Sequence, residues 1–203
     1  MYKNYLYGAS GHGKVVAEIA AESGITILGF IDQNKMIGEC LGLTVSETVP
    51  SEVDKIFISI GNNKVRKDIS KTFHNNQFLT LIHPKSTISK TAKIGVGSVV
   101  MAGVTINAEV QIGKHCIINT NSSIDHDGVI ENYVHISPNA TLAGNVLVGE
   151  GTHIGIGACV IQGIKIGKWV TIGAGTVVIK DIPDYAVVVG NPGKIIKYNN
   201  HEH

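Results

Sequence analysis

The chain has 203 residues, a formal net charge of +1, 43% hydrophobic residues and 16% charged residues, which is the composition of one or two well-buried globular domains. The near-zero charge and the absence of a basic block argue against a nucleic-acid partner. No apolar run approaches the ~20 residues that span a bilayer and the chain does not begin like a signal peptide, so we expect no membrane insertion. Three scattered cysteines without a CxxC pair favour a reducing, cytoplasmic location.

The N-terminal part of the chain, up to Pro84, alternates short apolar strands with helical patterns. Strands are predicted at 5–7, 25–31, 56–60 and 78–82, and helices at 15–20 and 64–74. This alternation is typical of a small parallel sheet with crossover helices. We therefore predict a Rossmann-like α/β domain over residues 1–84.

A glycine-rich turn, GASGHG at 8–13, joins the first strand to the first helix. Helix N-terminal amides point outward at such turns and bind phosphates. Asp32 ends the second strand, where a carboxylate could meet a ribose or a base. The spacing is GxxGxG and not GxGxxG, so a dinucleotide is not the first choice, and a purely structural turn remains an alternative.

A six-residue repeat occupies the next part of the chain. From Ile88 to Val178 every sixth residue is Ile, Val or Leu, sixteen times without an insertion. Glycine often follows at once, and we expect it to adopt the backbone conformation of a corner; a small or β-branched residue often stands four places on. Such a repeat is typical of a left-handed parallel β-helix, in which three hexapeptides close an 18-residue coil.

The fold class predicted for the chain is therefore mainly β. We expect the β-helix over residues 85–183 and a C-terminal tail over 184–203. The final His-Glu-His, 201–203, is expected to be a frayed end and not a metal site.

Polar residues interrupt the repeat at Asn119, at His135 and at the acids around His126. His126 follows the inward Ile124 by two residues, so it should project outward, with an acid on each side and Asn119 nearby. A carboxylate that holds one ring nitrogen raises the basicity of the other, as a general base requires. We predict that His126 is a general base, although a surface histidine among acids is the simpler alternative.

His135 and His153 are three hexapeptides apart and should stack in adjacent coils. Such a pair could begin a metal site, but a catalytic zinc site needs three convergent protein ligands. His115 falls on a different offset, so the third ligand is not evident. We expect no metal.

Taken together, several motifs resemble those of one bacterial family. They are GASGHG (8–13), IGNN (60–63), Asn119, DHD (125–127), HISP (135–138), AGN (143–145) and VGNPGK (189–194). They resemble the sugar O-/N-acetyltransferases with hexapeptide repeats, which include UDP-4-amino-sugar N-acetyltransferases and sialic-acid O-acetyltransferase-like proteins. The resemblance covers nearly the whole chain.

This resemblance implies a homotrimer with acetyl-CoA in grooves between neighbouring β-helices. It implies that His126 is the base, oriented by Asp127, with Asp125 as the other possible partner. The residues implied to meet acetyl-CoA are His135, Ile156 and Ala174. The residues implied to bind a UDP-linked amino sugar are Ser10, Gly11, His12, Asp32, Gly61 and Asn119.

The reaction implied is acetyl transfer from acetyl-CoA to the C4 amine of a UDP-linked amino sugar. Gly144 is our candidate for the amide that stabilises the tetrahedral oxyanion, because a glycine lets the thioester approach closely. O-acetylation of a sugar of the sialic-acid type remains an alternative, since the same base can activate a hydroxyl. Two other functions are less favoured. A γ-carbonic-anhydrase-like metal hydratase needs a closely spaced pair of histidines, which the repeat does not show. A non-catalytic sugar-binding scaffold would not need acids on both sides of a histidine.

Overall fold

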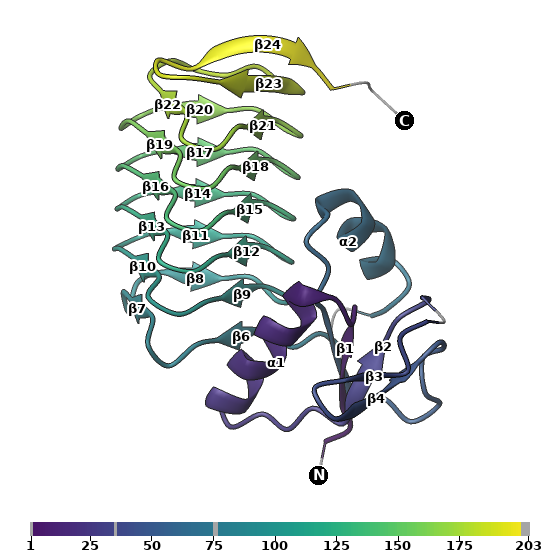
Figure 1. The fold of residues 1–203 in the computed structure, drawn as a ribbon. Coiled ribbons are helices and arrows are strands. Elements are labelled where there is room, and N and C mark those ends of the chain that lie inside the picture. The colour runs from purple at the N-terminus through teal and green to yellow at the C-terminus, as the bar shows by residue number, and fades with distance from the viewer. Residues whose placement is uncertain (1, 35, 75–76, 200–203) are drawn as a thin grey trace.

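The computed structural model describes residues 2–34, 36–74 and 77–199, and it shows a small α/β domain against one side of a tall column of stacked coils (Figure 1). The predicted fold class is confirmed: a left-handed parallel β-helix follows a Rossmann-like domain, and the chain is mainly β. The His-Glu-His end lies outside the described residues. Neither of the two helices in the described part of the chain is long and apolar enough to cross a membrane.

Three sheets form the walls of the β-helix, and we name each after its first strand. The β7 sheet contains β7 (Thr87–Ile88), β10 (Thr105–Ile106), β13 (Ser123–Ile124), β16 (Thr141–Leu142), β19 (Cys159–Val160) and β22 (Val177–Val178). The β8 sheet contains β8 (Lys93–Ile94), β11 (Gln111–Ile112), β14 (Val129–Ile130), β17 (Leu147–Val148) and β20 (Lys165–Ile166). The β6 sheet contains β6 (Leu81–Ile82), β9 (Val99–Val100), β12 (Ile117–Ile118), β15 (His135–Ile136), β18 (His153–Ile154), β21 (Thr171–Ile172), β23 (Ala186–Val189) and β24 (Lys194–Tyr198).

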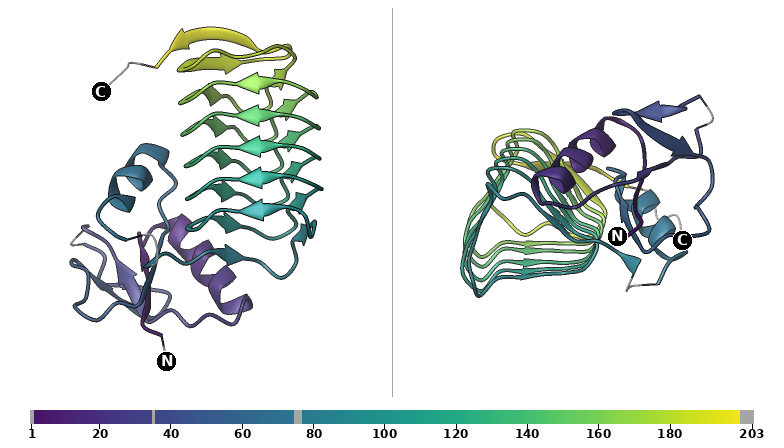
Figure 2. Two further views of the ribbon diagram at one scale, coloured as in Figure 1. Left: turned by 180° about the vertical axis from the view of Figure 1, so that it is seen from behind. Right: turned by 90° about the horizontal axis from the view of Figure 1, so that it is seen from below.

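The order of the strands along the chain shows how the column is built. β7, β8 and β9 lie in three different sheets, and β10 returns to the β7 sheet one coil later. Ladder partners are three hexapeptides apart, as in the pairs Ile88–Ile106 and His135–His153. The predicted coil of three hexapeptides is thus confirmed, and Figure 2 shows its triangular cross-section end-on.

From β7 to β22, the second residue of each two-residue strand points inward and builds the core. The aliphatic positions of the repeat are buried from Val100 to Val178, whereas Ile88 and Ile94 in the first coil are only partly buried. Burying one such side chain contributes roughly 1.5–3 kcal/mol. The repeat therefore supplies a large part of the favourable free energy of folding.

The glycines of the repeat have a different role from the predicted one. From Ile94 to Ile172, positive φ falls three places after each inward aliphatic residue, for example at Gly97, His115 and Asp127, and not at the glycines that directly follow it. Those glycines let neighbouring coils approach each other: a Cβ at Gly95 would lie 2.4 Å from the carbonyl carbon of Gly113. Residues of several types hold the left-handed corner conformation, while the glycine column serves contact between coils.

The ladder of coils extends beyond residues 85–183 at both ends. β6 pairs with β9, so part of the segment predicted as a fourth strand of the N-terminal sheet instead begins the β6 sheet. Phe78 still joins the N-terminal sheet by a bridge to Ile56. The cause is the repeat period, because Ile82 lies one hexapeptide before Ile88. At the other end β23 pairs with β21, and β24 turns back antiparallel to β23.

The N-terminal domain is built on a five-stranded sheet with the order β3-β4-β2-β1-β5. Its elements are β1 (Asn4–Tyr7), α1 (Gly11–Glu22), β2 (Gly29–Ile31), β3 (Glu39–Cys40), β4 (Leu43–Ser46), β5 (Lys55–Ile58) and α2 (Asn63–Ser70). The parallel pairing of β1 with β2 and β5 agrees with the prediction. The sequence does not signal the β3–β4 hairpin, because its two turn residues, Leu41 and Gly42, both have positive φ, and leucine is unusual in such a turn.

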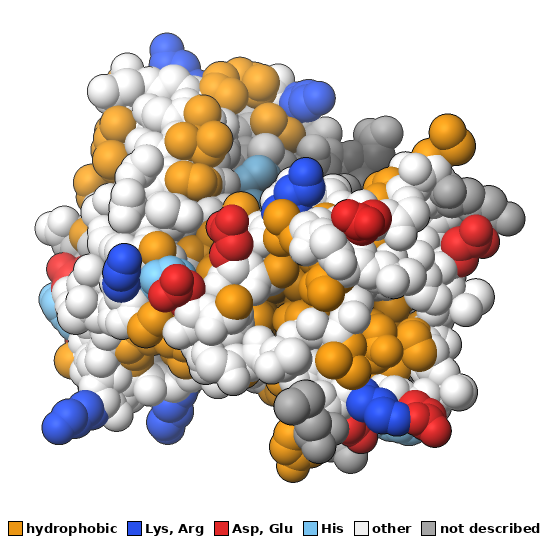
Figure 3. Space-filling model, turned by 60° about the horizontal axis from the view of Figure 1, so that its bottom comes forward, with side chains coloured by type: hydrophobic (Ala, Val, Ile, Leu, Met, Phe, Trp, Pro, Cys, Tyr) orange, Lys and Arg blue, Asp and Glu red, His pale blue; other side chains and the backbone are white. Residues whose placement is uncertain are grey.

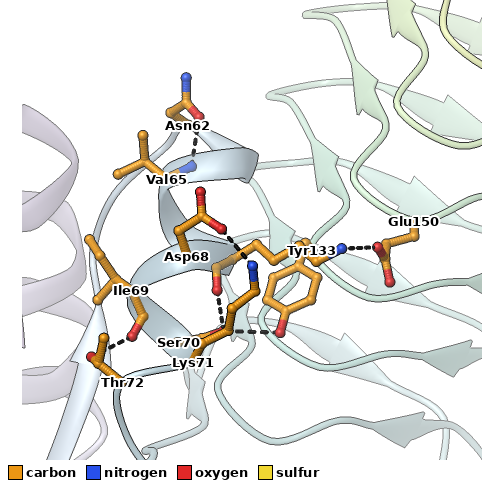
Figure 4. A network of polar contacts seen from close by, with 10 residues as sticks. Asn62, Val65, Asp68, Ile69, Ser70, Lys71, Thr72, Tyr133 and Glu150 are labelled. Atoms are coloured by element: carbon orange, nitrogen blue, oxygen red, sulfur yellow. Dashed lines mark hydrogen bonds and ion pairs between the residues drawn. The ribbon is translucent and has the colours of Figure 1, made fainter. Parts of the chain in front are cut away.

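Helix α2 attaches the N-terminal domain to the corner that leads into the β6 sheet. Ser70 Oγ lies 3.0 Å from the Tyr133 hydroxyl oxygen (Figure 4). Lys67 Nζ lies 2.5 Å from Glu150 Oε1. These contacts set the domain beside the β6 sheet, and the end-on view in Figure 2 shows it on one side of the column.

Candidate active site

His126 and Asp127 form a pair at an exposed corner that follows strand β13. Their side chains are 55% and 52% exposed, and His126 Nδ1 lies 2.7 Å from Asp127 Oδ2. An ionised carboxylate can only accept a hydrogen bond, so Nδ1 carries the proton and Nε2 keeps its lone pair. The pair therefore presents a neutral imidazole nitrogen to a ligand, as a general base must.

The two acids beside His126 make different contacts. Asp127 reaches the ring from the left-handed position of the corner, with φ of 57°, a conformation that Asp and Asn tolerate better than most residues. Asp125 Oδ1 instead accepts the His126 backbone N–H at 2.8 Å and the Asn107 side-chain amide at 2.7 Å. Asp127 thus contacts the ring, and Asp125 holds the backbone.

Both acids make His126 more basic. The hydrogen bond to Asp127, followed by the charge of Asp125, raises the pKa of His126 above its ordinary value. The pKa of Asp125 is lowered, first by the Asn107 hydrogen bond and then by the His126 backbone N–H. The imidazole therefore has a higher proton affinity than a free histidine.

Gly144 lies beside His126 in the next coil. A Cβ at this position would come within 2.6 Å of His126 Cε1 and Nε2, so the glycine leaves room for the imidazole ring. The approach of the thioester to this glycine stays a prediction. The Gly144 carbonyl accepts from Gly163, but its N–H donates no hydrogen bond to the described part of the chain. An unpaired amide next to a basic imidazole can stabilise a developing oxyanion.

The His126 corner faces away from the N-terminal domain. It joins the β7 and β8 sheets, whereas the N-terminal domain contacts the corner and face of the β6 sheet, as shown by the hydrogen bond from Asn63 Nδ2 to the Gly151 carbonyl. His126 therefore stands at the vertex of the triangle opposite the β6 sheet. Within one chain the structure does not bring together the predicted base and the predicted sugar-binding domain.

A second group of histidines lies on the outward face of the β6 sheet. The rings of His135 and His153 stack with their centroids 4.8 Å apart, as their equivalent places in successive coils predict. Asn119 Nδ2 lies 3.0 Å from His135 Nε2, and Ser137 Oγ lies 2.7 Å from His153 Nε2. Asn119 belongs with His135 and not with His126, because it points outward from the β6 sheet side of its coil.

Burial keeps these histidines uncharged at neutral pH. Burial lowers the pKa of His135 to about 3, helped by repulsion from a protonated His153 and from the Arg66 cation. Burial also lowers the pKa of His153, again with help from Arg66. His12 approaches from the N-terminal domain, and burial lowers its pKa to about 4. Its Nε2 is buried without a hydrogen-bond partner among the described residues.

The glycine loop leads into helix α1, as predicted. Ser10 is the N-cap residue and makes no side-chain capping bond, and both Ser10 and Gly11 are exposed. Asp32 turns back to the loop: its Oδ2 accepts the Ala9 N–H at 2.8 Å and its Oδ1 accepts the Asn34 N–H at 2.9 Å. The Asp32 carboxylate therefore fixes the conformation of the glycine loop. Its contact with a ribose or a base stays a prediction.

A hollow of about 250 Å³ lies between the segment before α2 and the β6 sheet. Its walls include Gly61, Asn63, Lys64, His153, Trp169 and Thr171. Gly61 thus stands where a ligand could touch both domains. The hollow is on the β6 side of the column, away from the His126 vertex of the same chain.

Ile156 and Ala174 occupy the third corner, between the β6 and β7 sheets. Both are exposed, and the Ile156 side chain is 57% exposed. They hold the same position in successive coils and so form a continuous row along the column. An exposed apolar row of this kind is open to a ligand or to a neighbouring chain.

Two residues of these sites carry no motif in the sequence. Asn107 stands one coil before Asp125, so its only signal is the coil offset. Arg66 is the only arginine of the chain. The sequence does not show that its side chain is buried, and its importance follows from that burial.

Charged groups are spread thinly over the molecule. On the face seen in Figure 3, acidic and basic side chains are interspersed and not gathered by sign. Within residues 2–34, 36–74 and 77–199, no group of three or more His, Cys, Asp or Glu side chains is placed to hold a metal ion.

Comparison with known proteins identifies the family. The chain superposes on a variant of perosamine N-acetyltransferase from Caulobacter crescentus, in complex with CoA and GDP-perosamine, with a TM-score of 0.92 and 33% identity over 97% of this chain and 98% of that one. The chain belongs to the hexapeptide-repeat family of sugar N-acetyltransferases. The resemblance that the motifs indicate is thereby confirmed.

Other members of this sugar N-acetyltransferase family agree. The acetyltransferase domain of PglB from Neisseria gonorrhoeae, in complex with acetyl coenzyme A, has a TM-score of 0.86 and 39% identity over 96% of this chain and 98% of that one. Residues 3–73 match the PglD N-terminal domain.

The curated relatives match over shorter stretches. UDP-N-acetylbacillosamine N-acetyltransferase from Bacillus subtilis (strain 168) is 42% identical over 108 residues, which are 48% of this chain and 50% of that protein. An uncharacterized protein of Acanthamoeba polyphaga mimivirus is 33% identical over 100 residues, which span 20% of that protein. The chain therefore spans half or less of the length of these curated relatives.

Proposed function

We propose that this chain transfers the acetyl group of acetyl-CoA to the C4 amine of a UDP-linked amino sugar, with His126 as the general base. The observation that carries the proposal is the His126–Asp127 pair beside the unpaired amide of Gly144. The relatives support the donor and the class of acceptor. One contains CoA with GDP-perosamine, one contains acetyl coenzyme A, and one is named for N-acetylation of a UDP-linked sugar.

The reaction follows from the properties of these groups. The unprotonated amine attacks the thioester carbonyl carbon, a C–N bond forms, and the carbonyl electron pair moves to oxygen. His126 Nε2 takes the proton from the amine as the bond forms, which contributes roughly 10²- to 10⁴-fold. The Gly144 N–H donates to the oxyanion. Collapse of the intermediate breaks the C–S bond, and the thiolate of CoA leaves and receives the proton from His126.

The acceptor is proposed to bind to the N-terminal domain and the hollow beside it. Exposed Ser10 and Gly11 at the start of α1 are suited to a diphosphate, because helix N-terminal amides favour anions. Gly61, Asn119 and His12 lie toward the β6 sheet, where neutral hydrogen-bonding groups would face the sugar. Asp32 acts by shaping the loop.

A homotrimer is proposed because one chain does not contain a complete site. Its base stands at the vertex opposite the β6 sheet, and its N-terminal domain lies beside that sheet. In a three-fold ring the vertex of one column can point toward the β6 side of the next, which brings His126 of one protomer to the N-terminal domain of another. Acetyl-CoA would then lie in the groove between columns, against His135, Ile156 and Ala174.

The test is release of CoA thiol from acetyl-CoA with a panel of acceptors: UDP-, GDP- and dTDP-linked 4-amino sugars, the corresponding 4-hydroxy sugars, and sialic acid. We expect turnover with a UDP-linked 4-amino sugar and a product heavier by about 42 Da, as replacement of one hydrogen by acetyl requires, with acetyl on the C4 nitrogen by NMR. Faster turnover of a hydroxyl acceptor would show that the enzyme is an O-acetyltransferase. Hydration of CO2 that is lost with a chelator and restored with Zn²⁺, without release of CoA thiol, would favour a metal hydratase.

A further inference from the structure

Arg66 is the only arginine in a chain with 17 basic residues, and its side chain is completely buried. A guanidinium is a planar fork with five N–H donors, whereas a lysine has a compact ammonium group. The chain uses lysine at every other basic position, including both sides of Arg66 on the same helix. Position 66 is therefore the place where the fork geometry matters.

Two donors of Arg66 hold the β-helix. Nε donates to the His115 carbonyl at 2.8 Å, and Nη2 donates to the Tyr133 carbonyl at 2.9 Å. Both carbonyls belong to the corner that leads into the β6 sheet, one coil apart. The guanidinium thus bridges two successive coils close to the stacked pair His135 and His153.

The other three donors hold the segment before helix α2. Nη1 donates to the carbonyls of Ile60 and Gly61 at 2.9 and 3.2 Å, and Nη2 donates to Asn63 Oδ1 at 2.8 Å. The amide of Asn63 then donates onward to the Gly151 carbonyl at 2.9 Å. Segment 60–63 is therefore fixed at three points by one side chain, and its residues 61–63 line the hollow beside the β6 sheet.

All five acceptors of Arg66 are uncharged. Burial lowers the pKa of Arg66 to about 10, so the group is still a cation at neutral pH. A buried charge without an ionic partner is costly, and apolar side chains of similar volume often stabilise a fold as well or better. The pattern of contacts indicates that this cation serves the geometry of the segment more than the free energy of folding.

We propose that Arg66 is a positioning residue for the acceptor: it fixes segment 60–63 against the β6 sheet, so that the hollow beside His153 keeps the shape into which the nucleotide-linked sugar fits. The inference rests on the proposed function for the identity of the ligand. The order of segment 60–63 can be measured without turnover, so a failure of this inference can be told apart from a failure of the proposed function.

The experiment compares Arg66→Lys and Arg66→Met with Lys67→Met. Lys67 is a matched control, because it neighbours Arg66 on α2 and also bridges the two domains, through its ion pair with Glu150. Each variant is assayed for the KM of the acceptor, the KM of acetyl-CoA and kcat. Hydrogen exchange of the 60–63 amides and calorimetric binding of UDP are measured on the protein without acetyl-CoA.

For Arg66→Lys we expect the KM of the acceptor to rise about tenfold, the equivalent of one charge-assisted hydrogen bond, with the KM of acetyl-CoA unchanged. The 60–63 amides should exchange faster and UDP should bind more weakly. Lys67→Met removes the ion pair with Glu150 and the contact of the ammonium with the Trp169 ring, but it leaves every hydrogen bond of segment 60–63 in place, so the 60–63 amides should exchange as in the wild type. If Arg66→Met does not fold, Arg66→Lys still decides the question.

Two results would overturn the proposal. In the first, Arg66→Lys folds but its 60–63 amides exchange as in the wild type. In the second, the KM of the acceptor and the KM of acetyl-CoA both rise, and they rise by the same factor in Arg66→Lys and in Lys67→Met. The second result would make Arg66 a purely structural link between the domains. If the wild type turns over no nucleotide-linked sugar, the proposed function fails. Amide exchange then decides alone whether Arg66 orders the segment.

Discussion

The two histidine sites of the β-helix differ in almost every physical property. His126 is half exposed, is paired with a carboxylate and has a raised pKa. His135 and His153 are mostly covered, contact neutral partners and have lowered pKa values. His126 follows its strand at a corner, whereas the other two stand on strands beside the N-terminal domain. In this fold the place of a histidine within the hexapeptide decides whether it can act as a base or as an uncharged hydrogen-bond partner.

The largest effect is expected from removing the base. His126→Ala should lower kcat by about 10²- to 10⁴-fold and leave the thermal midpoint unchanged, since the side chain is exposed. His74→Ala, at an exposed histidine outside both sites, is the control. Retention of more than a tenth of wild-type turnover by His126→Ala would show that His126 is not the general base.

A smaller effect is expected from displacing the base without removing it. In Gly144→Ala the new Cβ would lie 2.6 Å from the His126 ring, and because the ring is an exposed side chain it can move aside at little cost in stability. Misplacing a catalytic group by ~1 Å costs about 10²-fold, so kcat should fall by about that factor while the thermal midpoint holds. Gly38→Ala, where a Cβ meets open space, should be fully active. If Gly144→Ala is as active as the wild type, the proposed close packing of the His126 ring, Gly144 and the substrate is wrong.

The smallest effect distinguishes the two acids. Asp127→Asn keeps a residue that tolerates positive φ but removes the charge at the ring. The base itself remains, so kcat should fall only about tenfold, less than the 10²- to 10⁴-fold that general-base catalysis contributes. The carboxylate raises the pKa of His126, and the base acts in its neutral form. Removing the carboxylate lowers that pKa, so the acidic limb of the kcat/KM profile should move to lower pH.

Asp125→Asn provides the comparison for this pH profile. Its side-chain oxygen can still accept the His126 backbone N–H, so only the charge changes, and the acidic limb should move less than in Asp127→Asn. If Asp125→Asn gives the larger shift, the assignment of Asp127 as the orienting acid is wrong.

Much of the fold could be predicted from the sequence because the β-helix is strictly periodic. One aliphatic residue at each sixth position fixes the strand, the inward direction and the register between coils, and from these the stacking of His135 on His153 follows. The role of the glycines could not be read in this way, because a glycine that permits positive φ and one that permits close contact look alike. The Leu41–Gly42 turn and the loss of residues 81–82 to the β6 sheet depend on contacts with distant parts of the chain.

The candidate site was harder to predict than the fold. The motif around His126 shows two acids, but only the corner geometry shows which one reaches the ring. Asn119 is near His126 in the sequence, yet it lies on another side of the triangular coil and contacts His135. Arg66 has no motif, because its importance comes from burial and from acceptors that belong to two domains.

The central claim is that the base of one protomer serves the N-terminal domain of another, and mixed oligomers test it most directly. His126→Ala and Asp32→Ala chains, each expected to be inactive, are denatured together, refolded at equal amounts and assayed. Random mixing in a trimer should restore about a quarter of the wild-type sites, because a site then needs one intact base and one intact N-terminal domain from neighbouring protomers. No activity in the mixture, with exchange of subunits verified by mass spectrometry, would contradict the account and place the whole site within a single chain.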